Sequence, residues 1–389
     1  MITEFPLGSA VTLAQLDRDP HPVHARLRER EPVSWIPALG GWLVTRHDLA
    51  LEVMRDAATF TVDDPRFSTA RVIGPSMLSL EGERHAANRA PFTQPFRPRS
   101  VRERFAEPVA AEAGRLVAAL RPRGSAELRR AFAGPLAAVT VGRALGLAED
   151  ETGAVLGWYD AIVGAVTEIT AGRDLPADGT RSFGQLRARL LEVIDGADRS
   201  SVLAAAASSA GLGREEIVSN AAVLLFGGIE TTEGMIATSA LHLLERPRAL
   251  ERVRADPDLI APAIEESLRL EPAAAVIDRY ATADVRLAGA QISSGELVRI
   301  SLAAANRDPE VFDAPDRFDL DRGGAGRHVA FAQGPHVCVG VHLARLEART
   351  ALAALLSGLP GLRLNPRHEP AVRGLVFRKP QTLHVVWDR

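Results

Sequence analysis

The stretch from residue 214 to residue 246, REEIVSNAAVLLFGGIETTEGMIATSALHLLER, is the feature that most constrains the fold. It contains no proline before Pro247, and as a continuous helix it would be roughly 50 Å long. Asn220, Glu230 and Glu233 lie inside it, and these polar side chains argue against a membrane span. Because helices in proteins gain most of their stability from packing, we predict a long helix through the middle of a large globular core.

The remaining sequence predicts a mainly α-helical fold with small β-sheets, the α+β class. Short strand-like runs occur at 32–36 and 41–45, and strand-like pieces return after residue 280. Between 101 and 200, apolar residues recur at helical spacing, interrupted by proline and glycine. The sequence has no evident linker, low-complexity segment or internal repeat, so we predict a single domain over residues 1–389.

Composition narrows the classes of partner and compartment. The net charge of −3 gives no reason to expect the concentrated basic surface that nucleic-acid binding needs. A single cysteine permits no internal disulfide, and the N-terminus lacks a basic region followed by an apolar run. We therefore expect a cytoplasmic protein without a membrane anchor. Lys379 is the only lysine, which we attribute to genome base composition rather than to function.

The single cysteine, Cys338, lies in the segment FAQGPHVCVG, residues 331–340. With Phe331, Gly334 and Gly340 it forms the pattern FxxGxxxCxG, for which chance is a poor explanation. Glycines can adopt positive φ, which a loop needs if its amides are to point at a sulfur. A cysteine thiolate held in this way can be the axial ligand of a heme iron. The alternative is a buried free thiol in a glycine-rich turn.

The segment resembles the heme-binding loop of the cytochrome P-450 superfamily, the heme-thiolate monooxygenases, whose fold places a long helix over the heme and the cysteine loop beneath it. The resemblance implies a heme b cofactor with Cys338 as the axial ligand of its iron. It also implies that Phe331 is the aromatic neighbour of the cysteine, that Gly340 belongs to the heme-binding loop and that His336 contacts a heme propionate. Ala332 stands where the family more often has glycine.

Glu266 and Arg269 lie three residues apart in EESLR, on one face of a predicted helix. Alone this pair means little, because such pairs occur on many solvated helices and contribute only tenths of a kcal/mol. Its place ahead of the cysteine resembles the ExxR pair of the family, and PDRFDLDR (315–322) resembles the segment that completes this charge network. The resemblance implies a structural role, with Arg317 as the third member and Arg322 as the alternative.

Gly227 and Gly228 sit in the middle of the long predicted helix, where each costs about 1 kcal/mol relative to alanine. One explanation is packing, because glycines allow close helix crossing and a threonine can bond the carbonyl one turn earlier. The segment GGIETT also resembles the oxygen-activation motif of the family. The resemblance implies that Glu230 is the acid and Thr231 the alcohol that relay protons to oxygen, and that both glycines line the oxygen pocket.

The two propionates of a heme call for buried cationic donors. His85 and Arg89, at i and i+4 in EGERHAANR, resemble the HxxxR segment of the family, although alone such a pair is more often a solvated helix face. Arg279 in VIDRY occupies a family position for a propionate arginine, and alone it would be only a charge at a strand end. The resemblance therefore implies that these three residues and His336 bind the propionates.

The resemblance implies a reaction that uses O2 and two electrons to insert one oxygen atom into a C–H or C=C bond of an organic small molecule, in bacterial secondary metabolism. We expect a ferredoxin and its NAD(P)H-dependent reductase to supply the electrons, because the chain has no cysteine set for an iron–sulfur cluster. The candidate docking residues, which are equally explained as ordinary surface arginines, are Arg97, Arg99, Arg102, Arg104, Arg345 and Arg349.

Family position also implies a substrate pocket of small and aliphatic side chains, with Arg71 and Arg173 as candidate polar anchors. The predicted lining residues are Val72, Ile73, Val223, Ala274, Ala275, Val276, Ile277 and Val376. Two alternative functions stay open at this point. One is the same fold catalysing oxidative C–C or C–O coupling or desaturation without oxygen insertion, and the other is a non-catalytic heme-binding sensor.

Overall fold

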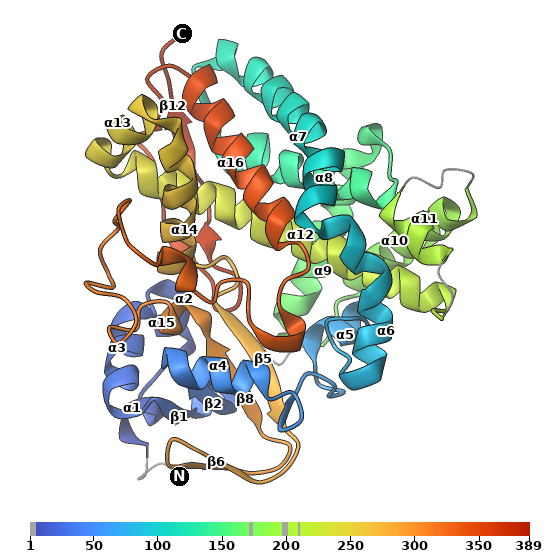
Figure 1. Ribbon diagram of the computed structural model, residues 1–389, viewed down its shortest axis with the longest axis vertical. Helices are drawn as coiled ribbons and strands as arrows, with labels where there is room; N and C mark the ends of the chain where they lie inside the picture. Colours follow the sequence, from blue (N-terminus) through green and yellow to red (C-terminus); the bar gives the residue numbers. More distant parts are fainter. Residues whose placement is uncertain (1–4, 171–173, 197–200, 209–210) are drawn as a thin grey trace.

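Figure 1 shows the fold of the computed structural model, which describes residues 5–170, 174–196, 201–208 and 211–389. The helices are α1 (Pro6–Ser9), α2 (Leu13–Arg18), α3 (His21–Arg30), α4 (His47–Arg55), α5 (Ser68–Ile73), α6 (Gly82–Thr93), α7 (Pro98–Leu120), α8 (Gly134–Leu145), α9 (Thr152–Thr170), α10 (Ala177–Asp195), α11 (Val202–Ala207), α12 (Arg214–Leu244), α13 (Pro247–Ala255), α14 (Ile260–Leu270), α15 (Leu302–Ala305) and α16 (Val341–Gly358). The strands are β1 (Val33–Ile36), β2 (Gly41–Val44), β3 (Phe60–Thr61), β4 (Ser125–Glu127), β5 (Val276–Ala281), β6 (Val285–Leu287), β7 (Ala290–Ile292), β8 (Leu297–Ser301), β9 (Arg363–Leu364), β10 (Val372–Arg373), β11 (Lys379–Pro380) and β12 (His384–Val386). The predicted mainly α-helical class with small β-sheets is confirmed.

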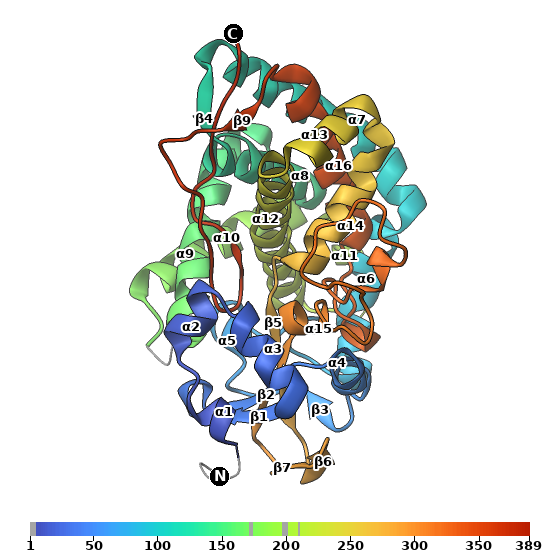
Figure 2. The ribbon, with the colours of Figure 1, turned by 90° about the vertical axis from the view of Figure 1, so that its left-hand side faces the viewer.

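The long helix predicted between 214 and 246 is α12, which runs through the centre of the molecule with other helices around it (Figure 2). The amide of Gly213 donates to the Glu216 carboxylate at 2.8 Å where the helix begins, and acidic residues in the first turn complement the helix dipole. Most of its residues are buried, and α8, α14 and α16 pack against it. None of the described helices, α12 included, combines the length and apolar character needed to cross a bilayer. The predicted passage through a large core is therefore confirmed.

The largest sheet has the strand order β1-β2-β8-β5-β3 and lies near the N-terminus, at the bottom of Figure 1. β2 and β8 pair in parallel, and the other neighbours are antiparallel. The strand-like runs at 32–36 and 41–45 form β1 and β2, with Trp35 opposite Trp42. Separate small sheets join β4, β12 and β9, then β10 and β11, then β6 and β7.

Two hydrophobic cores meet at the cysteine loop, which we define as residues 329–340. The larger core surrounds α12, and Phe331 and Val339 pack against it. The smaller core covers the five-stranded sheet, and Val329 and Ala332 pack there. Apolar burial on both sides therefore anchors the loop ahead of α16.

Candidate heme-thiolate site

The backbone of the cysteine loop presents Cys338 just before α16. The turn needs glycine at Gly334, where φ is +74° and an added Cβ would lie 2.4 Å from a backbone carbonyl oxygen of α4. Ala332 also has a positive φ, +57°, at the position where the resembling family more often has glycine. The Cys338 amide donates to the Phe331 carbonyl at 2.9 Å and closes the loop.

The Cys338 side chain has accessible surface, yet enough protein surrounds the sulfur to desolvate it. Burial raises the pKa of the thiol, while the Gly340 amide, Arg89 and Arg345 act in the opposite direction. A thiol in such a place loses its proton readily when it coordinates a metal ion, which is the chemistry expected of an axial ligand.

Two buried nitrogen atoms near the loop have no hydrogen-bond partner within the described part of the chain, Nε2 of His85 and Nη2 of Arg279. His85 is 6% exposed and Arg279 is 4% exposed, and Nη1 of the arginine donates to the Asp278 carbonyl at 2.8 Å. Burial, together with the charges of His336 and Arg89, lowers the pKa of His85 to about 4. A buried polar group without a partner costs about 1–3 kcal/mol, so both atoms call for a ligand.

Glu81 connects these groups to the cysteine loop. Its carboxylate lies 3.0 Å from Nε2 of His336, whose ring centroid is 4.3 Å from that of His85. Glu81 also interacts electrostatically with Arg279. Nη2 of Arg89 donates at 2.6 Å to the carbonyl of the residue before the cysteine. The four predicted propionate ligands thus lie around the loop, and this set of groups fits a flat cofactor that carries a metal ion and carboxylates.

The two central glycines of α12 have different surroundings. A Cβ on Gly227 would meet nothing within 4 Å, so this position faces open space. A Cβ on Gly228 would lie 3.1 Å from Cγ2 of Val141 on α8, so its missing side chain lets the two helices approach. Thr231 Oγ1 donates to the Gly227 carbonyl at 2.6 Å. The prediction that both glycines line an oxygen pocket is therefore corrected for Gly228, which serves helix packing.

The Glu230 carboxylate does not lie beside the Thr231 hydroxyl, as the predicted acid and alcohol pair would require. Consecutive helix residues point in different directions, and Glu230 is turned toward α9 and β11. It accepts a hydrogen bond from the Tyr159 hydroxyl, and its Oε1 lies 2.8 Å from Nζ of Lys379. Burial, with Glu230 and Glu233 nearby, raises the pKa of Tyr159, so the phenol stays protonated and donates.

Lys379 is shared by two buried carboxylates one helical turn apart. Its Nζ lies 2.7 Å from Glu233 Oε2 as well, and Arg129 Nε lies 3.2 Å from Glu233 Oε1. Desolvation favours the neutral form of Glu233, but the two cations outweigh it and lower its pKa. We call Glu230, Glu233, Lys379, Tyr159 and Arg129 the distal cluster. Of these five residues, sequence reasoning gave a role only to Glu230. The available signal for the lysine was that a chain otherwise using arginine has its one lysine here.

Glu266 and Arg269 of α14 form a fully buried ion pair, in which Nε and Nη2 of the arginine each lie 2.8 Å from the carboxylate. The third arginine is Arg322, whose Nε lies 2.9 Å from Glu266 Oε1. The Arg317 side chain is 69% exposed and pairs with Asp319, and only its carbonyl accepts from Arg269, at 3.1 Å. The prediction of Arg317 is wrong because the loop turns its carbonyl inward and its side chain to solvent. We call Glu266, Arg269 and Arg322 the proximal network.

Part of the predicted substrate pocket is assembled beside α12. Val72, Ile73 and Val223 are buried in the larger core. The segment that carries Val376 lies next to the start of β5, because the Ala275 amide donates to the Val376 carbonyl at 2.8 Å. Two further lining candidates lie nearby. Ala274 forms a β-bridge with Phe377 of this segment, and Ile277 packs against the smaller core. Of the polar anchors, Arg71 is exposed on α5 and Arg173 lies outside the described residues.

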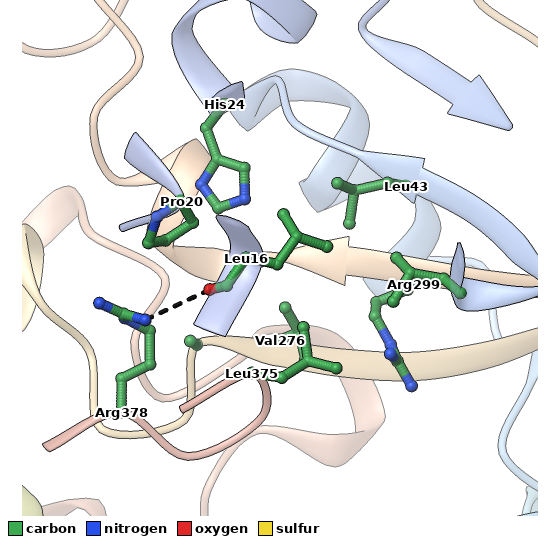
Figure 3. Close-up of a pocket in the computed structure, with 10 residues that line it drawn as sticks. Leu16, Pro20, His24, Leu43, Val276, Arg299, Leu375 and Arg378 are labelled. Atoms are coloured by element: carbon green, nitrogen blue, oxygen red, sulfur yellow. Dashed lines mark hydrogen bonds between the residues drawn. The ribbon is translucent and has the colours of Figure 1, made fainter. Parts of the chain in front are cut away.

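Ala275 and Val276 line a different space, a cavity of about 10 Å³ between the N-terminal helices and β5 (Figure 3). Its wall includes His24 and Arg378, and it has room for about one water molecule. Arg378 Nη1 donates to the Leu16 carbonyl at 3.4 Å and ties α2 to this wall. Ala275, just before β5, and Val276, its first residue, therefore also face the N-terminal part of the fold, and their place in the substrate pocket stays a prediction.

The candidate docking arginines also differ from one another. Arg345 lies 2.6 and 2.7 Å from the Glu265 carboxylate oxygens, so it is not a free surface arginine. Arg99 pairs with Glu103 at 2.7 Å, and the guanidinium of Arg104 lies over the ring of Phe105. The other three candidates are exposed: Arg97, Arg102 and Arg349.

Comparison with known proteins agrees with the geometry. Residues 198–360 match the family profile described as Cytochrome P-450. The chain is 34% identical to cytochrome P-450 monooxygenase PikC of Streptomyces venezuelae, over 95% of this chain and 92% of that protein. It is 32% identical to Nocardicin C N-oxygenase of Nocardia uniformis subsp. tsuyamanensis, over 98% of each.

Solved structures agree in fold. P-450BioI, in complex with hexadec-9Z-enoic acid ligated acyl carrier protein, aligns with a TM-score of 0.88 at 29% identity and covers 95% of this chain and 99% of that chain. CalO2 aligns with a TM-score of 0.88 at the same identity. The predicted fold and enzyme class are confirmed. The chain therefore belongs to the cytochrome P-450 family of monooxygenases.

Proposed function

We propose that this P-450 inserts one oxygen atom from O2 into an organic small molecule of bacterial secondary metabolism, by hydroxylation or epoxidation, with heme b as its cofactor. The observation that carries the proposal is the accessible Cys338 sulfur near two buried nitrogen atoms, on His85 and Arg279, that lack partners among the described residues. Heme b would supply both kinds of group: its iron would bind the sulfur, and its two propionate carboxylates would bind the nitrogen atoms.

Cys338 would ligate the iron as a thiolate, and the Gly340 amide would tune it through its interaction with the sulfur. His85 and Arg279 would bind the propionates, with His336 and Arg89 beside them. When bound, the heme supplies the binding and reduction of O2. The protein contributes orientation and a sheltered environment, and it holds the loop backbone through the Arg89 hydrogen bond.

The oxygen side of the site belongs to α12. Gly227 leaves room on its open face, and the Thr231 hydroxyl is held one turn away by its bond to the Gly227 carbonyl. We assign the proton transfer within the pocket to the Thr231 hydroxyl, at Oγ1. Glu230 takes up a proton from solvent and passes it to Thr231, and Lys379 and Tyr159 bind the deprotonated Glu230 carboxylate between transfers. Because neighbouring helix residues face differently, the Glu230 side chain must rotate out of the distal cluster to donate.

The substrate that we propose is a largely apolar organic molecule, because the residues beside α12 are aliphatic at Val72, Ile73 and Val223. The named relatives differ in substrate. They include a vitamin D(3) 25-hydroxylase of Pseudonocardia autotrophica, 32% identical over 94% of this chain and of that protein. These names support oxygen insertion as the reaction class and do not select a compound.

Electrons would come from a ferredoxin and its NAD(P)H-dependent reductase, and we infer that the enzyme works with them in the cytoplasm as one catalytic domain. The docking surface that we propose consists of the exposed residues Arg97 and Arg102 of the α7 end and Arg349 of α16. α7 and α16 pack against each other, so these charges lie on neighbouring helices (Figure 1). A small acidic protein complements such a surface.

Consumption of NADH by the heme-loaded enzyme, with ferredoxin, reductase and a panel of apolar natural products, tests the proposal. We expect one or more compounds to increase NADH consumption and to gain a single oxygen atom that derives from labelled O2. A product that has lost two hydrogens without gaining oxygen would favour coupling or desaturation. A ligand that binds and never changes NADH consumption would favour a sensor.

A further inference from the structure

Glu265, the residue before Glu266 on α14, organises a second ion pair that does not belong to the proximal network. Its carboxylate receives Nε and Nη2 of Arg345 from α16, at 2.6 and 2.7 Å. This bidentate geometry uses the planar fork of the guanidinium and fixes its orientation. The same carboxylate lies 3.2 Å from Nε2 of His328, at the entrance of the cysteine loop.

The hydrogen bonds of His328 define its protonated nitrogen. The Ala330 amide donates to Nδ1 at 3.2 Å, so Nδ1 is an acceptor and the ring proton of the neutral histidine is on Nε2. Nε2 therefore donates to Glu265. Burial would raise the pKa of Glu265, but the hydrogen bonds of Arg345 and His328 outweigh it and lower the pKa to about 2. The Glu265 carboxylate is ionised throughout the physiological pH range.

Both partners of Glu265 contact the aromatic ring of the loop. The guanidinium carbon of Arg345 lies 4.7 Å from the centroid of Phe331, and the His328 ring lies 6.1 Å from it at an angle of 42°. The Phe331 carbonyl accepts the Cys338 amide at 2.9 Å, so the backbone that carries this ring also holds the cysteine. One carboxylate on α14 therefore fixes two groups that hold Phe331 in place.

We propose that Glu265, Arg345 and His328 form a clamp on Phe331 that positions the Cys338 loop and thereby sets the reduction potential of the bound iron. Arg345 is then a positioning residue, not the ferredoxin-docking residue that its sequence position suggested. This inference rests on the proposed function, because it requires Cys338 to ligate a heme iron. Groups around the ligands of a metal commonly tune its potential in this way.

The test compares Arg345→Gln, Arg345→Lys and Glu265→Gln in the heme-loaded protein. The matched control is Arg349→Gln, one turn later on the same helix and exposed. The midpoint potential is measured with a chemical reductant and mediators, and electron transfer is measured with ferredoxin. We expect Arg345→Gln and Glu265→Gln to shift the potential, to weaken heme retention by about tenfold and to convert part of the carbonyl complex to a form with an unshifted Soret band.

Arg345→Lys distinguishes the clamp from ferredoxin docking, because it keeps the positive charge on which docking would depend. Lysine keeps the charge but has no planar fork to bind Glu265 in bidentate fashion and stack on Phe331, so a clamp predicts no rescue of the potential. The double variant of Glu265 and Arg345 should shift the potential no further than either single variant, because both break the same unit.

The clamp is wrong if all Arg345 variants keep the wild-type potential and carbonyl spectrum while Arg345→Gln slows ferredoxin reduction as much as Arg349→Gln does. Arg345→Lys, the mildest change, gives a folded variant if Arg345→Gln does not accumulate. Failure of the proposed function looks different, because the wild type itself would then lack the red-shifted carbonyl band.

Discussion

The proximal network and the distal cluster are both buried sets of opposite charges that join a helix to distant segments, yet they are built differently. In the proximal network, Glu266 accepts from Arg269, Arg322 and a backbone amide, and Arg269 also donates to three backbone carbonyls. In the distal cluster, Lys379 is shared between two carboxylates of one helix. The first set saturates its hydrogen bonds with fixed backbone, which suits a scaffold. In the second, the side chains of Lys379, Tyr159 and Arg129 hold the two carboxylates, which suits a carboxylate that must be released.

Glu266→Gln should break the proximal network and have the largest effect. Arg269 would remain buried with a neutral partner, and breaking a buried pair in this way costs about 3–5 kcal/mol. Urea unfolding of the heme-loaded protein measures the change in free energy of unfolding. A loss below about 1 kcal/mol, typical of an exposed ion pair, would show that the network is not the scaffold described above.

Lys379→Met should destabilise the distal cluster by about 2–3 kcal/mol at neutral pH, because two carboxylates lose a hydrogen-bonded cation. In the wild type, the lowered pKa of Glu233 contributes stability above its unfolded pKa, near 4.3, and this contribution is lost as pH falls through the lower folded value. Without Lys379, a main cause of the lowered Glu233 pKa is lost while burial stays, so the ionised carboxylate contributes less stability at neutral pH.

The difference in unfolding free energy between Lys379→Met and wild type should therefore narrow as the pH falls below about 4. Urea titrations over a series of pH values measure it, with Lys379→Arg as the control that keeps the charge. A difference that stays constant over this pH range would contradict the charge sharing that distinguishes the distal cluster.

Arg322→Gln and Arg317→Gln together test which of the two arginines belongs to the proximal network. Arg322 donates from Nε to Glu266 at 2.9 Å, so its loss should cost about 1.5–3 kcal/mol. Arg317 is exposed, so its substitution should stay within about 0.5 kcal/mol. Thermal unfolding of the two variants side by side makes the comparison, and equal losses would restore Arg317 as a member of the network.

Substitution of the two central glycines of α12 should have the smallest effect on stability. Gly227→Ala should stabilise the protein by up to about 1 kcal/mol, because its Cβ meets open space and alanine favours the helix. Gly228→Ala should gain less or lose stability, because its Cβ would press on Val141 at 3.1 Å. Urea unfolding measures the free energy of unfolding of both variants. If Gly228→Ala were the more stable of the two, Gly228 would be the residue that faces open space.

Sequence alone predicted the elements whose signals are local. The long helix, the helical class, the strands at 32–36 and 41–45 and the cysteine loop each follow from periodicity, turn residues or a compact motif. Glu266 and Arg269 were found because their order ahead of the cysteine resembles the ExxR pair of the family, while the helix spacing of three only places them on one face. Such features need no knowledge of the chain far away.

The corrections concern contacts that only the tertiary fold decides. Arg317 and Arg322 lie in one loop, and the backbone path alone turns one of them inward. Lys379 reaches Glu230 from more than a hundred residues away, so no local pattern announces the pair. Gly227 and Gly228 look alike in sequence, and the neighbouring helix α8 makes them different.

The absorption spectrum of the purified, reduced protein under carbon monoxide, beside that of Cys338→Ser, tests the central claim most directly. We predict a strongly red-shifted Soret band in the wild type that is absent in the variant, because only a thiolate ligand gives the iron that electronic environment. An unshifted band in intact wild-type protein, or no bound heme after expression with ample heme, would contradict the heme-thiolate site and return Cys338 to the role of a sheltered free thiol.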